Sequence, residues 1–130
     1  MMEEVKGDDS SGKFLFVEAT GWFKEVEAKP DEQNSYLHQL QNAVEGYIEC
    51  VPCWMDEHID IWINEEGKLE GLKYNHAATV LSTLEGDDLL VGNAIVTQTD
   101  DEGNKIPLSV IHLAALRAKL VGIGFREEVA

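Results

Sequence analysis

The chain has 130 residues, of which 44% are hydrophobic and 27% are charged. This length fits one domain that can bury a core without disulfides or metals, and the composition argues against wholesale disorder. No apolar stretch approaches the roughly 20 residues that a membrane span needs. Residues 1–10 lack the basic and apolar regions of a signal peptide. We therefore expect a cytoplasmic protein with no membrane partner.

The charge of the chain is strongly negative and unevenly distributed. It has 25 acidic and 10 basic residues, a net charge of −15 and a pI near 4.4. Residues 1–66 carry 16 acids and 4 lysines, whereas residues 67–130 carry 9 acids and 6 bases. Such a field repels nucleic acid and attracts basic surfaces, so direct nucleic-acid binding is not expected. The negative charge has three possible roles: it keeps the protein soluble, it forms a functional acidic surface, or it adapts the protein to high salt.

The first third of the chain predicts a flexible acidic tail followed by a β-hairpin. Residues 1–12 are polar and show no apolar periodicity, so the predicted single domain spans residues 13–130. Its first two strands are expected at 13–19 and 22–28, because both runs are rich in aromatic and β-branched residues and a Thr-Gly pair separates them.

A helix and a strand should follow this hairpin. Apolar residues three and four apart predict an amphipathic helix over roughly 33–45. Gly46 suits the left-handed conformation that often ends a helix. The apolar run 47–51 then predicts a strand, which Pro52 ends.

The middle of the chain predicts a second hairpin. Isoleucines alternate along 59–64, with residues 59, 61 and 63 on one face. Residues 64–67 read Asn-Glu-Glu-Gly, a tight turn in which Gly67 is expected to adopt a positive φ. Residues 68–72 are then expected to pair back as a strand.

The last third predicts two helices and the most apolar strand. Asn75 should cap a helix from His76 to about Leu84 that Gly86 closes. The apolar run 88–97 should lie centrally in the sheet.

Asp100–Asn104 is expected to form the turn that follows. Ser109 should cap a final helix that reaches about Leu120. Arg117 is expected beside its apolar stripe with the charge reaching water. The stripe residues are Val110, Leu113, Leu116 and Leu120.

This order of elements, joined by short connections, predicts the α+β class. We expect a mostly antiparallel sheet of about five to seven strands backed by two or three helices.

Four short blocks follow one another in the chain: Gly46-Tyr47-Ile48-Glu49, Asn64-Glu65-Glu66-Gly67-Lys68-Leu69, Asn75 with Ala78-Thr79, and Val91-Gly92-Asn93-Ala94. In this order, and over roughly residues 37–105, the chain resembles a family found in bacteria, their plasmids and their phages, the domain of unknown function 3846. The resemblance implies a cytoplasmic setting and a viral or plasmid origin, and it carries no activity. The shared residues have two interpretations: backbone and capping roles, or a ligand surface built from Tyr47, Glu49, Asn75 and Asn93.

Cys50-Val51-Pro52-Cys53 is the sharpest local motif. A redox CxxC normally opens a helix, whose N-terminus lowers the thiol pKa, but here a helix precedes the pair. His58 offers a third zinc ligand, and only His38, His76 or His112 could supply a fourth from a distance. Two ordinary cysteines, a metal site and a redox pair all remain open; we expect no metal and no cofactor.

No complete catalytic site is visible. Asp100–Asn104 lacks the alternating oxygen ligands of an EF-hand, so a solvated turn is expected there. The chain contains no Gly-x-Ser-x-Gly, no Walker loop and no Gly-x-Gly-x-x-Gly. Enzymatic activity is therefore not expected, although a site assembled by the fold stays open.

These observations favour a non-catalytic accessory protein of a phage or mobile element that binds a host protein. One version mimics the charge of DNA. The expected contacts flank a strand and a tight turn: Asp56, Glu57, Asp60, Glu65 and Glu66. The alternative is a binder of a small molecule or nucleotide signal, which would use Arg117, Lys119 and Arg126 near one another. Partner identity and oligomeric state cannot be read from the sequence.

Overall fold

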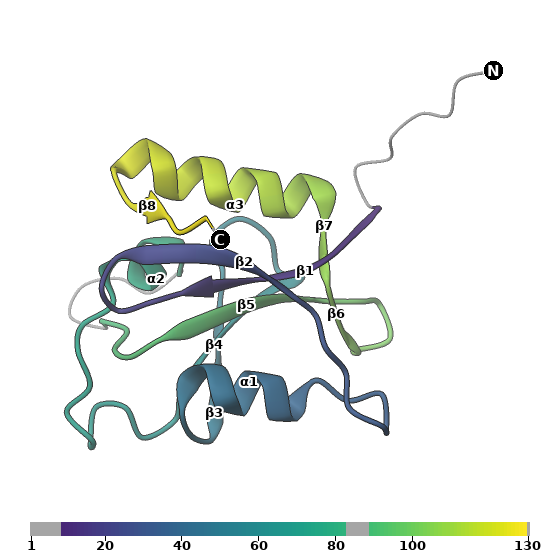
Figure 1. The fold of residues 1–130 in the computed structure, drawn as a ribbon, viewed down its shortest axis with the longest axis horizontal. Helices are drawn as coiled ribbons and strands as arrows, with labels where there is room; N and C mark the ends of the chain where they lie inside the picture. The colour runs from purple at the N-terminus through teal and green to yellow at the C-terminus, as the bar shows by residue number, and fades with distance from the viewer. Residues whose placement is uncertain (1–8, 83–88, 130) are drawn as a thin grey trace.

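The structure, a computed structural model, describes residues 9–82 and 89–129. Within these residues the fold is α+β, as predicted, with eight strands in one sheet and three helices (Figure 1). The elements are β1 (Ser10–Val17), β2 (Trp22–Glu27), α1 (Leu37–Val44), β3 (Ile48–Pro52), β4 (Ile59–Asn64), α2 (His76–Leu81), β5 (Ala94–Thr99), β6 (Lys105–Ile106), β7 (Leu108–Ser109), α3 (Val110–Ile123) and β8 (Arg126–Glu127).

The main path of the sheet is β3-β4-β5-β1-β2-β8, with β6 paired to β5 and β7 paired to β1. Every pairing is antiparallel except that of β2 with β8. β5 lies between β4 and β1, which confirms that the most apolar strand is central. The predicted opening hairpin is also confirmed, since β1 and β2 pair from Lys13 with Glu27 to Val17 with Phe23.

The sheet separates two apolar cores because alternate side chains point to opposite faces. Leu15, Ile61 and Val96 belong to the core that includes residues of α2 and α3. Phe14 and Ile95 belong to the smaller core that includes residues of α1. Figure 1 shows α1 on one side of the sheet and α3 on the other. No helix in residues 9–82 and 89–129 is long and apolar enough to cross a membrane.

Local capping residues act as predicted. Asn75 Oδ1 accepts a hydrogen bond from Ala78 N at 2.9 Å, and Ser109 Oγ accepts one from His112 N at 3.1 Å. α2 ends at Leu81, and the predicted closure at Gly86 lies outside the described residues. α3 runs three residues past the predicted end, to Ile123, where Gly124 adopts a left-handed conformation with φ of 117°.

α1 begins at Leu37, four residues later than predicted. The cause is Asp31, whose Oδ1 accepts hydrogen bonds from Gln33 N at 2.8 Å and Ser35 N at 2.9 Å. These bonds hold the chain in a turn that competes with the helix. The end of α1 also differs, because Glu45 and not Gly46 takes the left-handed position, with φ of 62°.

The predicted second hairpin is wrong beyond its turn. Gly67 N donates to Asn64 O at 3.1 Å, so the turn exists, but Gly67 does not have a positive φ. Position 67 favours glycine because there is little room for a side chain: a Cβ there would lie 3.0 Å from Val91 Cγ2 and 3.3 Å from Asn64 O. Residues 68–71 form turns and residue 72 is irregular, so 68–72 is not a strand; Gly71 has φ of 68°.

Two further predictions need correction. The central strand begins at Ala94, because Gly92 has φ of 78° and interrupts the extended run; the predicted first residue, Asp88, lies outside the described residues. A Cβ at Gly92 would also lie 2.8 Å from Leu72 Cδ1, so the chain packs closely at this glycine. Val110 is exposed and does not belong to the buried stripe of α3.

Candidate functional site

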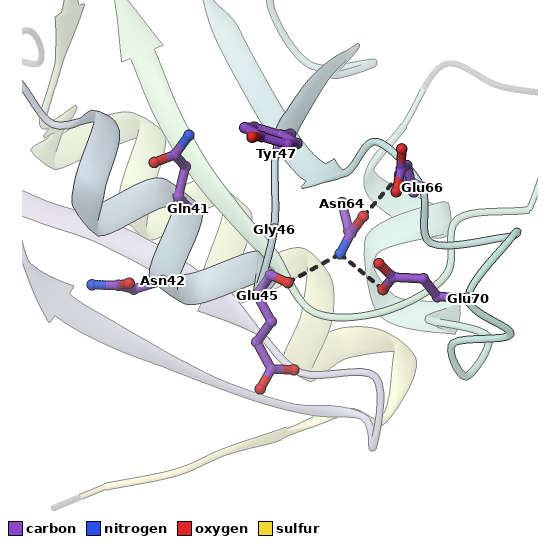
Figure 2. Close-up of a pocket in the computed structure, with 8 residues that line it drawn as sticks. All are labelled: Gln41, Asn42, Glu45, Gly46, Tyr47, Asn64, Glu66 and Glu70. Carbon is purple, nitrogen blue, oxygen red and sulfur yellow. Dashed lines mark hydrogen bonds between the residues drawn. The ribbon is translucent and has the colours of Figure 1, made fainter.

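Asn64, the last residue of β4, connects three segments of the chain. Its side chain is 4% exposed. Nδ2 donates to Val44 O at 3.2 Å and to Glu45 O at 3.4 Å, both at the C-terminal end of α1. Nδ2 also lies 3.4 Å from Glu70 Oε2, and Oδ1 accepts from Glu66 N at 2.8 Å (Figure 2). One buried amide therefore holds the end of α1 against the turn that follows β4.

A pocket of about 510 Å³ opens beside this amide. Its wall comes from α1 and the segment after it on one side, and from the turn after β4 on the other (Figure 2). Among the described residues, the lining combines carboxylates, side-chain amides and one phenol ring and contains no lysine or arginine: Gln41, Asn42, Glu45, Gly46, Tyr47, Asn64, Glu66 and Glu70. Such a lining suits a cation, because acceptor oxygens and an aromatic face both attract positive charge.

A second pocket, of about 430 Å³, shares Asn64 with the first. Its apolar lining includes Val51, Ile63 and Leu90, which belong to the buried core. Its rim carries Glu49, Glu65 and Lys68, together with Leu69, which is 89% exposed. The turn after β4 thus lines hollows with different chemistry, one mainly polar and one with an apolar floor.

Acidic side chains that are distant in sequence gather around the two pockets. Five glutamates line them, all exposed and, among the described residues, none in an ion pair: Glu45, Glu49, Glu65, Glu66 and Glu70. We call this set the glutamate rim. Other acids of the chain are paired with bases: Glu25 pairs with Lys13 at 3.1 Å, and Glu127 pairs with Arg117 at 2.6 Å. The fold therefore leaves uncompensated negative charge at the glutamate rim.

The five residues predicted to contact a partner do not form one surface. Asp56 and Glu57 precede β4, whereas Glu65 and Glu66 follow it. At about 3.3 Å per residue, the ends of this six-residue strand lie roughly 17 Å apart. Asp60 lies on β4, where its carboxylate accepts from Thr99 Oγ1 and from Cys50 Sγ. Only Glu65 and Glu66 belong to the glutamate rim.

Asp56 belongs instead to a histidine cluster. Its Oδ1 accepts from His58 N at 2.8 Å and lies 3.1 Å from His58 Nδ1, and its Oδ2 lies 3.1 Å from His112 Nε2. The backbone bond from His58, followed by the contacts with His112, lowers the pKa of Asp56. The hydrogen bond to Asp56 raises the pKa of His58 above its ordinary 6.5.

The same cluster contains the residue types of a Ser-His-Asp triad. His112 Nδ1 lies 2.7 Å from Ser109 Oγ and 3.2 Å from Gln98 Oε1. Ser109 is only 1% exposed, however, and its Oγ caps α3. A nucleophilic serine must reach a substrate carbonyl, so this geometry supports a structural connection between Asp56 and α3.

The four residues predicted as a ligand surface are also separated. Tyr47 lines the first pocket and is 70% exposed, and Glu49 lines the second. Asn75 is fully buried, and its Nδ2 donates to Val17 O at 3.1 Å and to Gly92 O at 2.8 Å. Asn93 Oδ1 accepts from Ala19 N at 3.1 Å. The two asparagines thus bond to the backbone of the fold.

The two cysteines lie in different environments and are not bonded to each other. Cys53 is buried and Cys50 is exposed. Partial burial, followed by the charge of Asp60, raises the pKa of the Cys50 thiol to about 12, and burial also raises that of Cys53. Raised thiol pKa values oppose both redox chemistry and metal binding. The described residues contain no group of three or more His, Cys, Asp or Glu side chains placed to hold a metal.

The Asp100–Asn104 segment is a hydrogen-bonded turn. Asp100 Oδ1 accepts from Glu102 N at 2.9 Å and from Asn104 N at 2.8 Å. The backbone closes as Asp100 N donates to Asn104 O at 2.9 Å. The side chain that would begin a calcium loop is therefore directed at its own turn.

Comparison of the sequence with protein families identifies the family of this chain. Residues 10–119 match the model of the family described as Domain of unknown function (DUF3846), and the chain belongs to it. The match is wider than the 37–105 span that carries the recognisable blocks, and it includes every residue of both pockets. Searches of curated proteins and of solved structures found no match.

Proposed function

We propose that this protein is a non-catalytic binding protein whose glutamate rim engages a basic macromolecule. The supporting observation is the rim itself: five exposed glutamates, with no ion-pair partner in the part of the chain that the structure describes, surround two pockets that share the buried Asn64. The surface is preorganised, because Asn64 ties α1 to the turn that carries Glu65 and Glu66. Preorganised charge costs less to order when a partner binds.

The chemistry of the first pocket favours a cationic side chain of the partner as its occupant. Glu45, Glu66 and Glu70 supply carboxylates, and the ring of Tyr47 can stack on an ammonium or guanidinium group. The second pocket offers Leu69 and an apolar floor to neighbouring residues of the same partner. An anchored base beside an apolar contact is a common arrangement at protein interfaces.

The alternative function, binding of a nucleotide signal, receives less support. Within residues 9–82 and 89–129, no lysine or arginine lines the first pocket, and Lys68 is the single base of the second. A phosphate at either place would meet carboxylates with little compensation. The bases expected to bind a nucleotide are occupied: Arg117 pairs with Glu127 and Glu25, Lys119 lies over Trp54, and Arg126 lies over Trp22.

The family resemblance supplies the proposed setting. We infer a cytoplasmic accessory factor of a phage or another mobile element, acting on a host protein with a basic surface. A basic groove that normally holds nucleic acid is one such surface, since the net charge of −15 can take the place of phosphates. Attraction of this kind speeds association and weakens as salt shortens the Debye length from about 10 Å at 0.1 M to about 3 Å at 1 M.

The test uses two triple variants that remove the same charge. Glu45→Gln, Glu65→Gln and Glu66→Gln together neutralise part of the glutamate rim. Glu27→Gln, Glu32→Gln and Glu102→Gln together neutralise exposed acids elsewhere. The probes are a labelled arginine-rich peptide and a host protein first captured by the wild type from cell extract and then purified.

At 0.05 M salt, the rim variant should associate roughly tenfold more slowly than the wild type. The second variant should stay within about twofold, and all three proteins should converge near 1 M salt. Equal slowing of both variants would show that only net charge matters, and the proposed function would then be abandoned.

A further inference from the structure

α3 is apolar on the side that faces solvent as well as on the side that faces the sheet. Leu113, Leu116 and Leu120 are buried against the core. On the solvent side, Ile111 and Val121 are 58% and 56% exposed. A surface helix normally carries polar residues opposite its buried stripe, and a helix that is apolar all round normally lies buried. The outer face of α3 is therefore unusual for a helix that this fold covers on one side only.

The outer face has the spacing of a helix-packing seam. Ile111, Ala115, Ala118 and Gly122 are all exposed and follow one another at intervals of four, three and four residues. Alternating steps of three and four residues are the pattern by which one helix packs along another. Three of the four residues are alanine or glycine, which let a second helix approach closely.

The same helix carries no negative charge. α3 contains no Asp or Glu, although the chain has a net charge of −15. Its bases are engaged: Arg117 pairs with Glu127 and Glu25, and Lys119 lies 5.2 Å from the centre of the Trp54 ring. Two copies of so acidic a protein repel each other over most of their surfaces. At α3 they can meet without opposing carboxylates from either helix.

The order of residues in the seam indicates that a second copy of this chain packs on the outer face of α3. We propose that α3 is a homodimer interface in which two copies pair antiparallel about a two-fold axis between Leu116 and Arg117. The intervals of four, three and four read the same in both directions, so the seam of one copy can align in register with the reversed seam of another, as an isologous interface requires. The axis sets Ile111 against the partner's Gly122 and Ala115 against the partner's Ala118. The largest seam side chain thus faces the residue that has none.

The direction of the two helices favours this pairing, because an antiparallel pair sets opposite helix dipoles side by side.

The size of the face sets the expected affinity. Fourteen residues make a helix about 21 Å long, and one helix pair buries less than the roughly 800 Å² per partner of a standard interface. We therefore expect a weak dimer with a dissociation constant on the order of 10–100 μM. Raising the salt concentration should lower the dissociation constant of the dimer, because salt screens the repulsion between two chains that each have a net charge of −15. This salt dependence is opposite to that of the glutamate rim.

Sedimentation equilibrium of the full chain tests the proposal, from about 1 μM to 1 mM protein at 0.1 M and 1 M salt. Wild type should dimerise within this range, and more tightly at 1 M. Ala118→Glu should weaken the dimer at least tenfold, because it places two carboxylates near the axis. Gly122→Ile should do so without a charge change, by filling the space that receives the partner's Ile111. Leu37→Glu, at an exposed position of α1 across the sheet, adds the same charge and should change the constant less than threefold.

Circular dichroism and thermal unfolding establish that each variant is folded. A wild type that stays monomeric at 1 mM and 1 M salt overturns the proposal. So does a dimer that persists unchanged in both seam variants, since the interface would then lie elsewhere. Equal weakening by Leu37→Glu and Ala118→Glu would assign the effect to net charge and would overturn it as well. None of these outcomes bears on the glutamate rim.

Discussion

The side-chain amide of Asn64 occupies the space that a side chain at Gly46 would need. A Cβ at Gly46 would lie 2.7 Å from Asn64 Nδ2, although the two residues are 18 positions apart. Gly46 does not have a positive φ, so it is required by contact and not by backbone angle. Gly46 and Asn64 therefore act as one unit at the end of α1.

The first prediction is a coupled pair of substitutions. Gly46→Ala should lower the free energy of unfolding by about 1–3 kcal/mol, because either Asn64 or the end of α1 must move. In an Asn64→Ala background the same change should cost less than about 0.5 kcal/mol, since the clashing amide is absent. Urea denaturation of the four proteins measures the coupling energy. An equal cost in both backgrounds would show that the two residues do not compete for space.

The second prediction concerns charge at position 64. Asn64→Asp removes the donor to Val44 O and Glu45 O and places a carboxylate near Glu70. We expect a loss of about 2 kcal/mol or more at pH 7. The buried carboxyl should have a raised pKa, so the loss is present above its unfolded pKa near 3.9 and shrinks as pH falls toward it.

Asn42→Asp is the matched control for this change, because Asn42 lines the same pocket but is exposed. It should stay within about 0.5 kcal/mol of wild type. If both variants unfold at the same urea concentration at pH 7, the bonds of Asn64 contribute little and the preorganisation of the pocket is in doubt.

The third prediction is a titration of the histidine cluster. Because the hydrogen bond to Asp56 raises the pKa of His58, its NMR titration should be centred above 6.5. The stabilisation from His58 is complete below the unfolded value and is lost as pH rises through the folded value. The stabilisation from Asp56, whose pKa is lowered, is present above its unfolded value of 3.8 and is lost as pH falls through the folded one.

Asp56→Asn should move the His58 titration down toward its ordinary value. Glu49→Gln, which also removes one acid but lies on β3, should leave the titration in place. A His58 midpoint at or below 6.5 in the wild type would contradict the bond to Asp56.

The fourth prediction addresses thiol reactivity. With its pKa raised to about 12, Cys50 should react slowly with Ellman's reagent at pH 8 despite its exposure, and buried Cys53 should react only on unfolding. Asp60→Asn should speed the reaction at Cys50 but not fully, because burial is the larger cause of the shift. Fast reaction of Cys50 in the wild type would show that its thiolate is accessible after all.

The features predicted correctly from sequence are those that depend on near neighbours. Asn75 and Ser109 cap helices three residues away, and the isoleucines of β4 alternate within six residues. The roles of Gly46 and Gly67 were predicted wrongly, because the atoms that restrict them belong to Asn64 and Val91. The sequence pattern around a glycine does not reveal contacts with residues about 20 positions away.

In the candidate site, too, the residues predicted correctly are those that are close in sequence. Glu65 and Glu66 were predicted as contacts because they lie in one turn with Asn64. Glu45 and Glu70 were missed, since nothing in their local sequence distinguishes them from the other acids. Asn64 was the available signal, because an asparagine that ends an apolar strand and begins a turn often uses its side chain to bond the backbone.

The short C-terminal strand completes the edge of the sheet. β8 pairs in parallel with β2 at Trp22 and Phe23, and Glu128 N donates to Phe23 O at 2.7 Å. Arg117 fastens this strand through its ion pair with Glu127. A chain cut after Gly124 would leave the backbone groups of β2 open beside the exposed ring of Trp22, and unpaired apolar edges are templates for aggregation. We therefore expect the two residues of β8 to protect this edge of the sheet against aggregation.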